Sequence, residues 1–284
     1  MNLSNYDTIY FNGCSFTEGG GFEAGKVWIK NAYKQKYGFE YINEQEVCYP
    51  TIVQTLLPNL KVINDAKSGS GTERVIRRTW EYIFKNGLDK SKKTIFSLEL
   101  PGSISRLDLF SNEEYEYLVG NIEYNEKGKV NDTQIVVDWI YGPPLNENYR
   151  NETRRILKEY SEAFIHPVEK EKQVAYSLFG LASFMILNDI QFYFSGDTSY
   201  TQYHLNLQYD YPNFNNEHIL NLKIDNNYYN NIVTFADTTK TKISDEVGVD
   251  VTTDRHPGFQ AHKDWAKAFV DFLQNKDNYK KQII

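Results

Sequence analysis

The sequence contains little cysteine and no long apolar run. Its two cysteines, Cys14 and Cys48, leave no disulfide framework and no cysteine-based zinc site, and they fit a reducing compartment. No apolar run approaches the roughly 18 residues that a membrane-spanning helix needs. Residues 1–7 have neither the basic region nor the apolar core of a signal peptide. We therefore expect a soluble, cytoplasmic protein with no membrane partner.

Positive charge and histidine are also scarce. The chain has 31 Lys and Arg against 38 Asp and Glu, a formal net charge of −7. This balance argues against a surface that binds nucleic-acid phosphates. Apart from one His in a C-terminal motif, the histidines show no metal-ligand spacing, and they are His166, His204, His218 and His262. We therefore expect neither a nucleic-acid partner nor a metal site.

The chain does contain a repeated succession of strand, small-residue turn and helix. With 284 residues and 40% hydrophobic content it can bury a substantial core. Short β-rich runs predict strands at 8–11, 60–64, 93–100 and 190–195. Apolar residues at helical spacing predict helices at 49–57, 74–85, 171–188 and 260–274. This alternation predicts an α/β domain whose parallel sheet is covered by helices on both faces.

Two regions interrupt this pattern. Residues 107–171, after the third predicted strand, are too many for a connecting loop, and we expect a largely helical insertion or cap there. Residues 198–231 are rich in aromatic residues and Asn and show little periodicity. The run 232–235 after them predicts a last short strand. No linker composition divides the chain, so we expect one domain over residues 1–284.

Three groups of residues lie where a hydrolase needs them. Ser15 comes after the first strand, Gly69 after the second, and Asp254 and His256 lie just before the last helix. A serine hydroxyl is a weak nucleophile unless a base accepts its proton, and an imidazole held by a carboxylate is the usual base at neutral pH. Backbone N–H groups of Ser15 and Gly69 would then donate to a developing oxyanion.

These segments carry a resemblance to a known family. The chain resembles the SGNH hydrolases, also called the GDSL esterase and lipase family, in a variant whose first block reads GCSFT. The similar segments are the run Gly13–Gly19, the pair Ser68 and Gly69 following Asn64, and the C-terminal run Asp254–Pro257. Their arrangement also fits, because Ser comes first and Asp and His lie together near the C-terminal end, unlike the G-x-S-x-G elbow of the α/β-hydrolases.

The resemblance implies a fold and a reaction. The implied fold is a flavodoxin-like, three-layer α/β/α sandwich, and no cofactor is expected. The implied reaction is ester hydrolysis by a triad of Ser15, His256 and Asp254. Members of the GCSFT type are associated with bacteriophages and with polysaccharide loci, which adds a virion-associated location to the cytoplasmic one.

The sequence departs from the family pattern at Cys14, where the family usually has Asp. A thiol beside Ser15 raises the alternative that Cys14 attacks the substrate. The hydroxyl position, which Thr17 follows at the family spacing, is the one that matches, and a free cysteine is often only a small buried residue. Ser15 is therefore the predicted nucleophile.

A second departure concerns the third block, after the third predicted strand. The family places an Asn there that donates to the oxyanion, whereas residues 99–106 contain none. Either Ser103, Ser105 or another group substitutes, or the enzyme is weak, because one lost donor costs about 10²–10³ in rate. Arg106 in the same stretch would bind a substrate carboxylate or phosphate, or would pair internally with Glu99 or Glu73.

The sequence therefore leaves three functions open. The first is a serine esterase that removes short acyl groups, in particular O-acetyl groups, from a small ester or an acylated glycan. The second is a catalytically weak or inactive protein of the same fold that binds glycans or serves as a phage component. The third is an acyltransferase that uses the same triad. The oligomeric state is not indicated.

Overall fold

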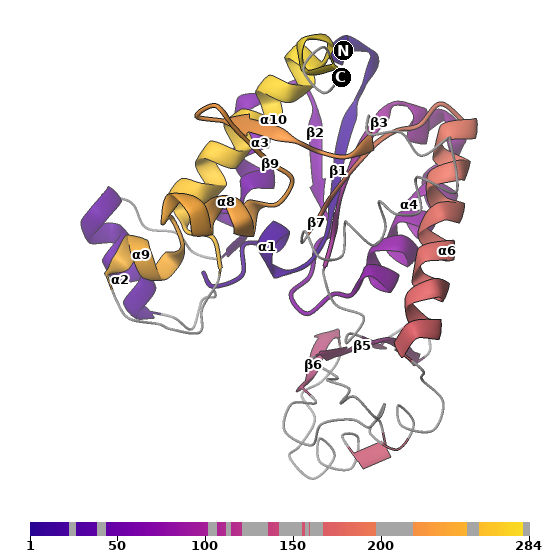
Figure 1. Cartoon of the computed structure of the whole chain (residues 1–284), viewed down its shortest axis with the longest axis horizontal. Coiled ribbons are helices and arrows are strands. Elements are labelled where there is room, and N and C mark those ends of the chain that lie inside the picture. The colour runs from indigo at the N-terminus through magenta and orange to yellow at the C-terminus, as the bar shows by residue number, and fades with distance from the viewer. Residues whose placement is uncertain are drawn as a thin grey trace.

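Four parallel strands form the centre of the molecule (Figure 1). Their order across the sheet is β2, β1, β3, β7, the order of flavodoxin-like sheets. Their bounds, all within a residue or so of the predicted strands, are β1 Thr8–Asn12, β2 Lys61–Asn64, β3 Thr94–Leu100 and β7 Gln191–Gly196. The computed structural model describes residues 1–22, 27–38, 44–101, 107–111, 115–120, 136–141, 155–156, 159, 167–196, 218–248 and 256–280.

Helices cover both faces of this sheet. Side chains alternate along β1, so that Ile9 and Phe11 face one layer while Tyr10 faces the other. Figure 1 shows one pair of helices on each side: α3 (Tyr49–Leu56) with α10 (Phe259–Lys280), and α4 (Thr72–Lys92) with α6 (Pro167–Leu187). The prediction of a three-layer α/β/α fold with a central parallel sheet is therefore confirmed.

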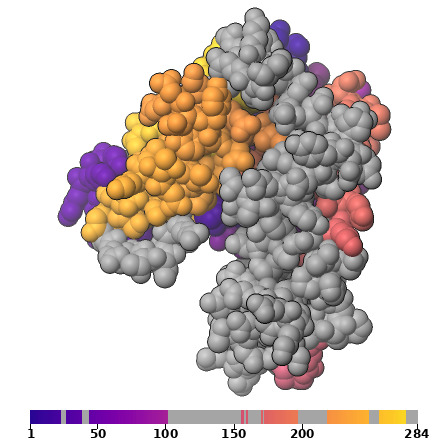
Figure 2. All heavy atoms as spheres, viewed as in Figure 1, coloured from indigo at the N-terminus to yellow at the C-terminus, as the bar shows by residue number. Residues whose placement is uncertain are grey.

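The α10 side of the sheet carries the thicker layer. Trp265 and Phe269 of α10 are buried there, and the Phe269 ring lies 5.3 Å from that of Phe11, centroid to centroid. Further short elements lie on this side of the molecule. They are α1 Ser15–Glu18, α2 Val27–Tyr37, β8 Leu222–Ile224, β9 Asn227–Tyr229, α8 Ile232–Thr239 and α9 Ile243–Val247. In the space-filling view, the orange segment 218–248 forms a broad surface beside the violet α2 (Figure 2).

The insertion after β3 differs from its prediction. Its described residues form an antiparallel sheet in the order β4, β5, β6, so the expectation of a largely helical insertion is wrong for this part. The strands are β4 Leu107–Ser111, β5 Tyr115–Gly120 and β6 Val136–Tyr141. Their sequences are rich in aromatic and β-branched residues, which favour a pleated surface over a helix. The remaining residues of 107–171 lie outside the description, except 155–156, 159 and the start of α6.

A second correction concerns residues 232–235, where a strand was predicted. They begin the helix α8, because the Asn231 side chain accepts hydrogen bonds from the N–H groups of Val233 and Thr234. Such an N-cap satisfies donors that a helix start leaves free. Ile232 and Phe235 are then buried on one face. The segment 198–231 is described from residue 218 onward, where β8 and β9 form a hairpin rather than irregular chain.

No helix among the described residues is long and apolar enough to cross a membrane.

Candidate active site

The candidate site lies at the carboxyl end of β1. The chain leaves β1 for β2 on one side and later enters β3 on the other, so this end of β1 is the switch point of the sheet. Ligands of open α/β sheets bind at such points. Ser15 begins α1 immediately beyond the strand, with Cys14 as the N-cap residue. The topology therefore places the predicted nucleophile where a substrate can be held.

His256 meets Ser15 at this point. The Nε2 atom of His256 lies 3.0 Å from the Oγ atom of Ser15, although the two residues are 241 positions apart in the chain. The Ser15 hydroxyl can donate to Nε2 when the imidazole carries its proton on Nδ1. Ser15 is only 6% exposed. A hydroxyl and an imidazole in hydrogen-bond contact are the minimum that base-assisted nucleophilic attack requires.

Gly20 lets the backbone pass close to this pair. A Cβ atom at Gly20 would lie 2.6 Å from Ser15 Cβ and 2.9 Å from His256 Nε2. Real Cβ atoms do not approach other atoms so closely, so any side chain at this position would displace one of the two residues. The glycines after α1, Gly20 and Gly21, are therefore part of the wall of the site.

The His256 main chain is held by the segment before and within α9. The Ile243 N–H donates to the His256 carbonyl at 3.1 Å, and the Gly258 N–H donates to the Thr241 carbonyl at 2.7 Å. The ring of Phe16 lies 5.4 Å from the His256 ring, centroid to centroid. These contacts fix where the imidazole enters the site.

Glu246 of α9 then anchors the helix that follows His256. Its carboxylate accepts hydrogen bonds from the Gln260 N–H at 2.8 Å and from the Tyr33 hydroxyl at 2.6 Å. The first of these donors belongs to the first turn of α10, where a carboxylate is favourable. Burial raises the pKa of Glu246, although these hydrogen bonds oppose the shift. Sequence reasoning missed Glu246, because its partners come from segments far apart in the chain.

Glu99 lies beneath the nucleophile turn, at the end of β3. Its carboxylate accepts a hydrogen bond from the Thr17 hydroxyl and a longer one, at 3.4 Å, from the Cys14 N–H. The Cys14 thiol also points to this carboxylate, with Sγ 3.7 Å from Oε2. The described contact of the His256 ring nitrogen is with Ser15 Oγ. The described contacts thus place the Ser15 hydroxyl against the base and the Cys14 thiol against the Glu99 carboxylate.

The loop that follows β2 contributes the second candidate oxyanion donor. The Ser70 N–H donates to the Lys67 carbonyl at 3.0 Å, which closes a turn with Gly69 at its third position. Gly69 has φ +82°, the value that such a position in a type II turn requires and that glycine adopts without strain. The N–H groups of Ser15 and Gly69 have no hydrogen-bond partner among the described residues, so both remain available to a ligand.

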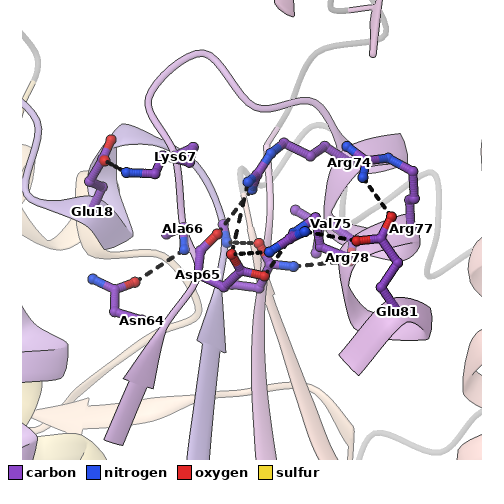
Figure 3. A network of polar contacts seen from close by, with 12 residues as sticks. Glu18, Asn64, Asp65, Ala66, Lys67, Arg74, Val75, Arg77, Arg78 and Glu81 are labelled. Atoms are coloured by element: carbon purple, nitrogen blue, oxygen red, sulfur yellow. Dashed lines mark hydrogen bonds and ion pairs between the residues drawn. The ribbon is translucent and has the colours of Figure 1, made fainter. Parts of the chain in front are cut away.

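An arginine cluster holds the start of this loop (Figure 3). Arg78 donates to both carboxylate oxygens of Asp65 at 3.0 Å, and the buried Arg74 donates to the Asp65 carbonyl at 2.9 Å. The Tyr10 hydroxyl also donates to Asp65, at 2.7 Å. Burial and the neighbouring Asp65 raise the pKa of Tyr10. The loop is thus anchored to α4 and to β1 at the residue that follows β2.

Several predicted site residues lie outside the described part of the chain. They are Asp254, Ser103, Ser105 and Arg106. Of the two carboxylates proposed as internal partners of Arg106, Glu73 pairs with Lys170 at 2.7 Å and Glu99 binds the nucleophile turn. Within the described residues, no group of three or more His, Cys, Asp or Glu side chains is arranged to hold a metal ion.

Comparison with known proteins gives similarity only at the level of three-dimensional structure. No protein-family model and no curated protein matches the sequence. The esterase EstA from Pseudoalteromonas sp. aligns with 11% identity and a TM-score of 0.43, over 95% of this chain and 100% of that one. The acetylxylan esterase Axe2 from Geobacillus stearothermophilus, as a catalytic mutant, aligns with 13% identity and a TM-score of 0.39, over 93% and 92%.

A third similar structure is LAE5, an alpha/beta hydrolase enzyme from the metagenome of Lake Arreo. It aligns with 12% identity and a TM-score of 0.41, over 94% of this chain and 95% of that one. Similarity at these levels does not identify an activity. The functional conclusion therefore rests on the contacts of Ser15.

Proposed function

We propose that this protein is a serine ester hydrolase in which Ser15 attacks the ester carbonyl and His256 acts as the general base. The observation that carries this proposal is the 3.0 Å contact between Ser15 Oγ and His256 Nε2. It joins the two ends of the chain at the switch point of the sheet. A serine and a histidine paired there have the geometry of an activated nucleophile.

The reaction would proceed through an acyl-enzyme. As Ser15 Oγ bonds to the carbonyl carbon, its proton passes to His256 Nε2, and the carbonyl oxygen becomes an oxyanion. The N–H groups of Ser15 and Gly69 would donate to that oxyanion. When the intermediate collapses, the alcohol leaves with the proton from His256. Water then attacks the acyl group, again losing a proton to His256, and the carboxylic acid and free Ser15 are released.

Asp254 is the proposed third member of the triad. It precedes His256 by two positions, and the family resemblance gives it the role of accepting the Nδ1 proton of the imidazole. A carboxylate in this role fixes the tautomer in which Nε2 is free to accept from Ser15, and it stabilises the imidazolium that forms. Its removal is expected to lower the rate less than removal of Ser15 or His256.

The proposed substrate is a short acyl ester, in particular an O-acetyl group on a carbohydrate. Support for a small acyl group comes from the burial of Ser15 and from the backbone of Gly20 against it, because both restrict the space beside the nucleophile. The carbohydrate part rests on the family resemblance alone. None of the proposed steps uses a metal or a cofactor.

A fluorophosphonate probe tests the identity of the nucleophile. The probe should label the wild type and the Cys14→Ala variant and should fail to label Ser15→Ala, because the hydroxyl lies 3.0 Å from the base. Peptide mass spectrometry locates the modified residue. Labelling of Ser15→Ala together with loss of labelling in Cys14→Ala would make the thiol the nucleophile and would overturn the assignment.

A further inference from the structure

Glu18 joins the two segments that carry the candidate oxyanion donors. It is the last residue of α1, one helical turn after Ser15, and its side chain is 8% exposed. One carboxylate oxygen pairs with Lys67 Nζ at 2.9 Å, and the other accepts from the Ser68 N–H. Figure 3 shows Glu18 and Lys67 facing each other across the site edge of the sheet.

A buried carboxylate needs charged or hydrogen-bonding partners. Both oxygens of Glu18 take theirs from residues 67–68, which lie directly before Gly69. Charge-assisted hydrogen bonds are shorter and stronger than neutral ones, so this pair of contacts holds α1 and the loop in a fixed spacing. The spacing in question is the one between the N–H groups of Ser15 and Gly69.

The loop does not depend on Glu18 for its position on the sheet. The Lys67 N–H donates to the Gly13 carbonyl at 3.2 Å, and the Asp65 N–H donates to the Phe11 carbonyl at 2.9 Å. Asp65 is also held by α4, as described above. What Glu18 adds is a bond to the Ser68 N–H, one residue before Gly69, which restrains the backbone that leads to the Gly69 N–H.

We propose that Glu18 is a positioning residue that aims the Gly69 N–H at the oxyanion. This inference rests on the proposed function, and it gives a role to a residue that the similar run Gly13–Gly19 contains but for which the resemblance implied none. An oxyanion donor stabilises the transition state more than the bound substrate. Misplacing it by a fraction of an ångström therefore weakens transition-state stabilisation and changes substrate binding little. Loss of Glu18 should therefore lower kcat and leave KM nearly unchanged.

The test compares the wild type with Glu18→Ala, Glu18→Gln and a control in another ion pair, Asp7→Asn. Asp7 pairs with Lys93 at 3.9 Å, directly before the starts of β1 and β3 and so at the opposite end of the sheet from Ser15. With p-nitrophenyl acetate, Glu18→Ala should lose about 10- to 100-fold in kcat with KM within about 3-fold. Asp7→Asn should retain wild-type kinetics.

Glu18→Gln provides the conservative variant. Its amide carbonyl still accepts from the Ser68 N–H but no longer pairs with the Lys67 charge, so its kcat should lie between those of the wild type and Glu18→Ala. The rate of fluorophosphonate labelling should fall in the same order, because the phosphoryl oxygen occupies the same donors. If Glu18→Ala does not fold, the nearly isosteric Glu18→Gln carries the comparison.

Two results would overturn the inference while leaving the proposed function intact. One is a kcat within about 2-fold of wild type in a folded Glu18→Ala. The other is an equal loss of kcat in Asp7→Asn, which would mean that any weakened ion pair has this effect. Failure of the proposed function is distinguishable, because the wild type itself would then show no turnover that depends on Ser15, and the role of Glu18 would fall with it.

Discussion

At the scale of single residues, Gly20 is where the site tolerates least change. Its missing side chain leaves room for Ser15 Cβ and His256 Nε2, both within 3 Å of the position that a Cβ atom would take. A methyl group there finds no empty space and would push the imidazole away from the hydroxyl. The structural cost and the catalytic cost of a substitution therefore coincide at this position.

We accordingly expect Gly20→Ala to lower kcat/KM by about 10²-fold, the usual effect of misplacing a catalytic group by about 1 Å. The matched control is Gly180→Ala, because Gly180 lies in α6 with nothing within 4 Å of its added Cβ. That control should keep full activity and gain up to about 1 kcal/mol in stability. Steady-state kinetics on both variants checks the prediction, and wild-type kcat/KM in Gly20→Ala would contradict it.

His262 shows how a buried group ties stability to pH. It is fully buried, and its Nδ1 accepts from the Tyr49 N–H at 3.2 Å, at the start of α3. Burial, with a smaller effect of His256, lowers the pKa of His262 to about 3. The unfolded chain, with a His pKa near 6.5, then binds more protons than the folded chain between these two values. His262 therefore stabilises the fold above about pH 6.5 and loses that contribution as the pH falls toward about 3.

We expect His262→Gln, which keeps an acceptor for the Tyr49 N–H, to flatten this dependence. Between pH 6.5 and pH 4, its free energy of unfolding should fall less steeply than that of the wild type, by up to about 1.4 kcal/mol per pH unit. Urea unfolding at a series of pH values measures the slopes. Identical slopes in the two proteins would show that His262 does not titrate on unfolding.

At the scale of elements, α9 links the cap of α10 to the backbone of His256. Glu246 holds the first turn of α10, and Ile243 holds the His256 carbonyl. These two residues of one short helix restrain the chain at His256 and again at Gln260, and so restrain where the imidazole lies. α2 joins this arrangement through the Tyr33 hydroxyl, which donates to Glu246. Two elements far apart in the chain, α2 and α9, therefore both act on the site through His256.

Glu246→Ala should accordingly affect both stability and rate. It leaves the Gln260 N–H and the buried Tyr33 hydroxyl without their acceptor, which costs about 1–3 kcal/mol, and it should also lower kcat through His256. The control is Asp237→Ala, which removes the ion pair between Asp237 and Lys242. The Asp237 side chain is 43% exposed, so this substitution should cost less than about 1 kcal/mol. Equal losses of stability and rate in the two variants would contradict this role of Glu246.

At the scale of the whole molecule, the sequence predicts the layers better than the contacts between them. The strands and helices of the central sheet carry their signal locally, in β-rich runs and in apolar residues at helical spacing. Residues 232–235 show the limit of such signals. The apolar run alone favours a strand, and the cap that makes it a helix comes from the single residue Asn231.

The site was predictable to the extent that its residues follow strands. Ser15 and Gly69 lie where the ends of β1 and β2 place them, and His256 was expected from its motif. Glu18, Glu99 and Glu246 could not be assigned, because an isolated Glu gives no indication of its partners and theirs lie 50, 85 and 213 positions away. Long-range contacts of this kind follow from the fold and not from any local pattern.

The roles of Ser15 and His256 are tested most directly by the steady-state hydrolysis of p-nitrophenyl acetate at neutral pH by the wild type, Ser15→Ala and His256→Ala. We expect a wild-type rate well above background that falls by at least about 10³-fold in each variant. A wild-type rate that persists in Ser15→Ala would contradict the assigned nucleophile. Background rates in all three proteins would contradict esterase activity itself.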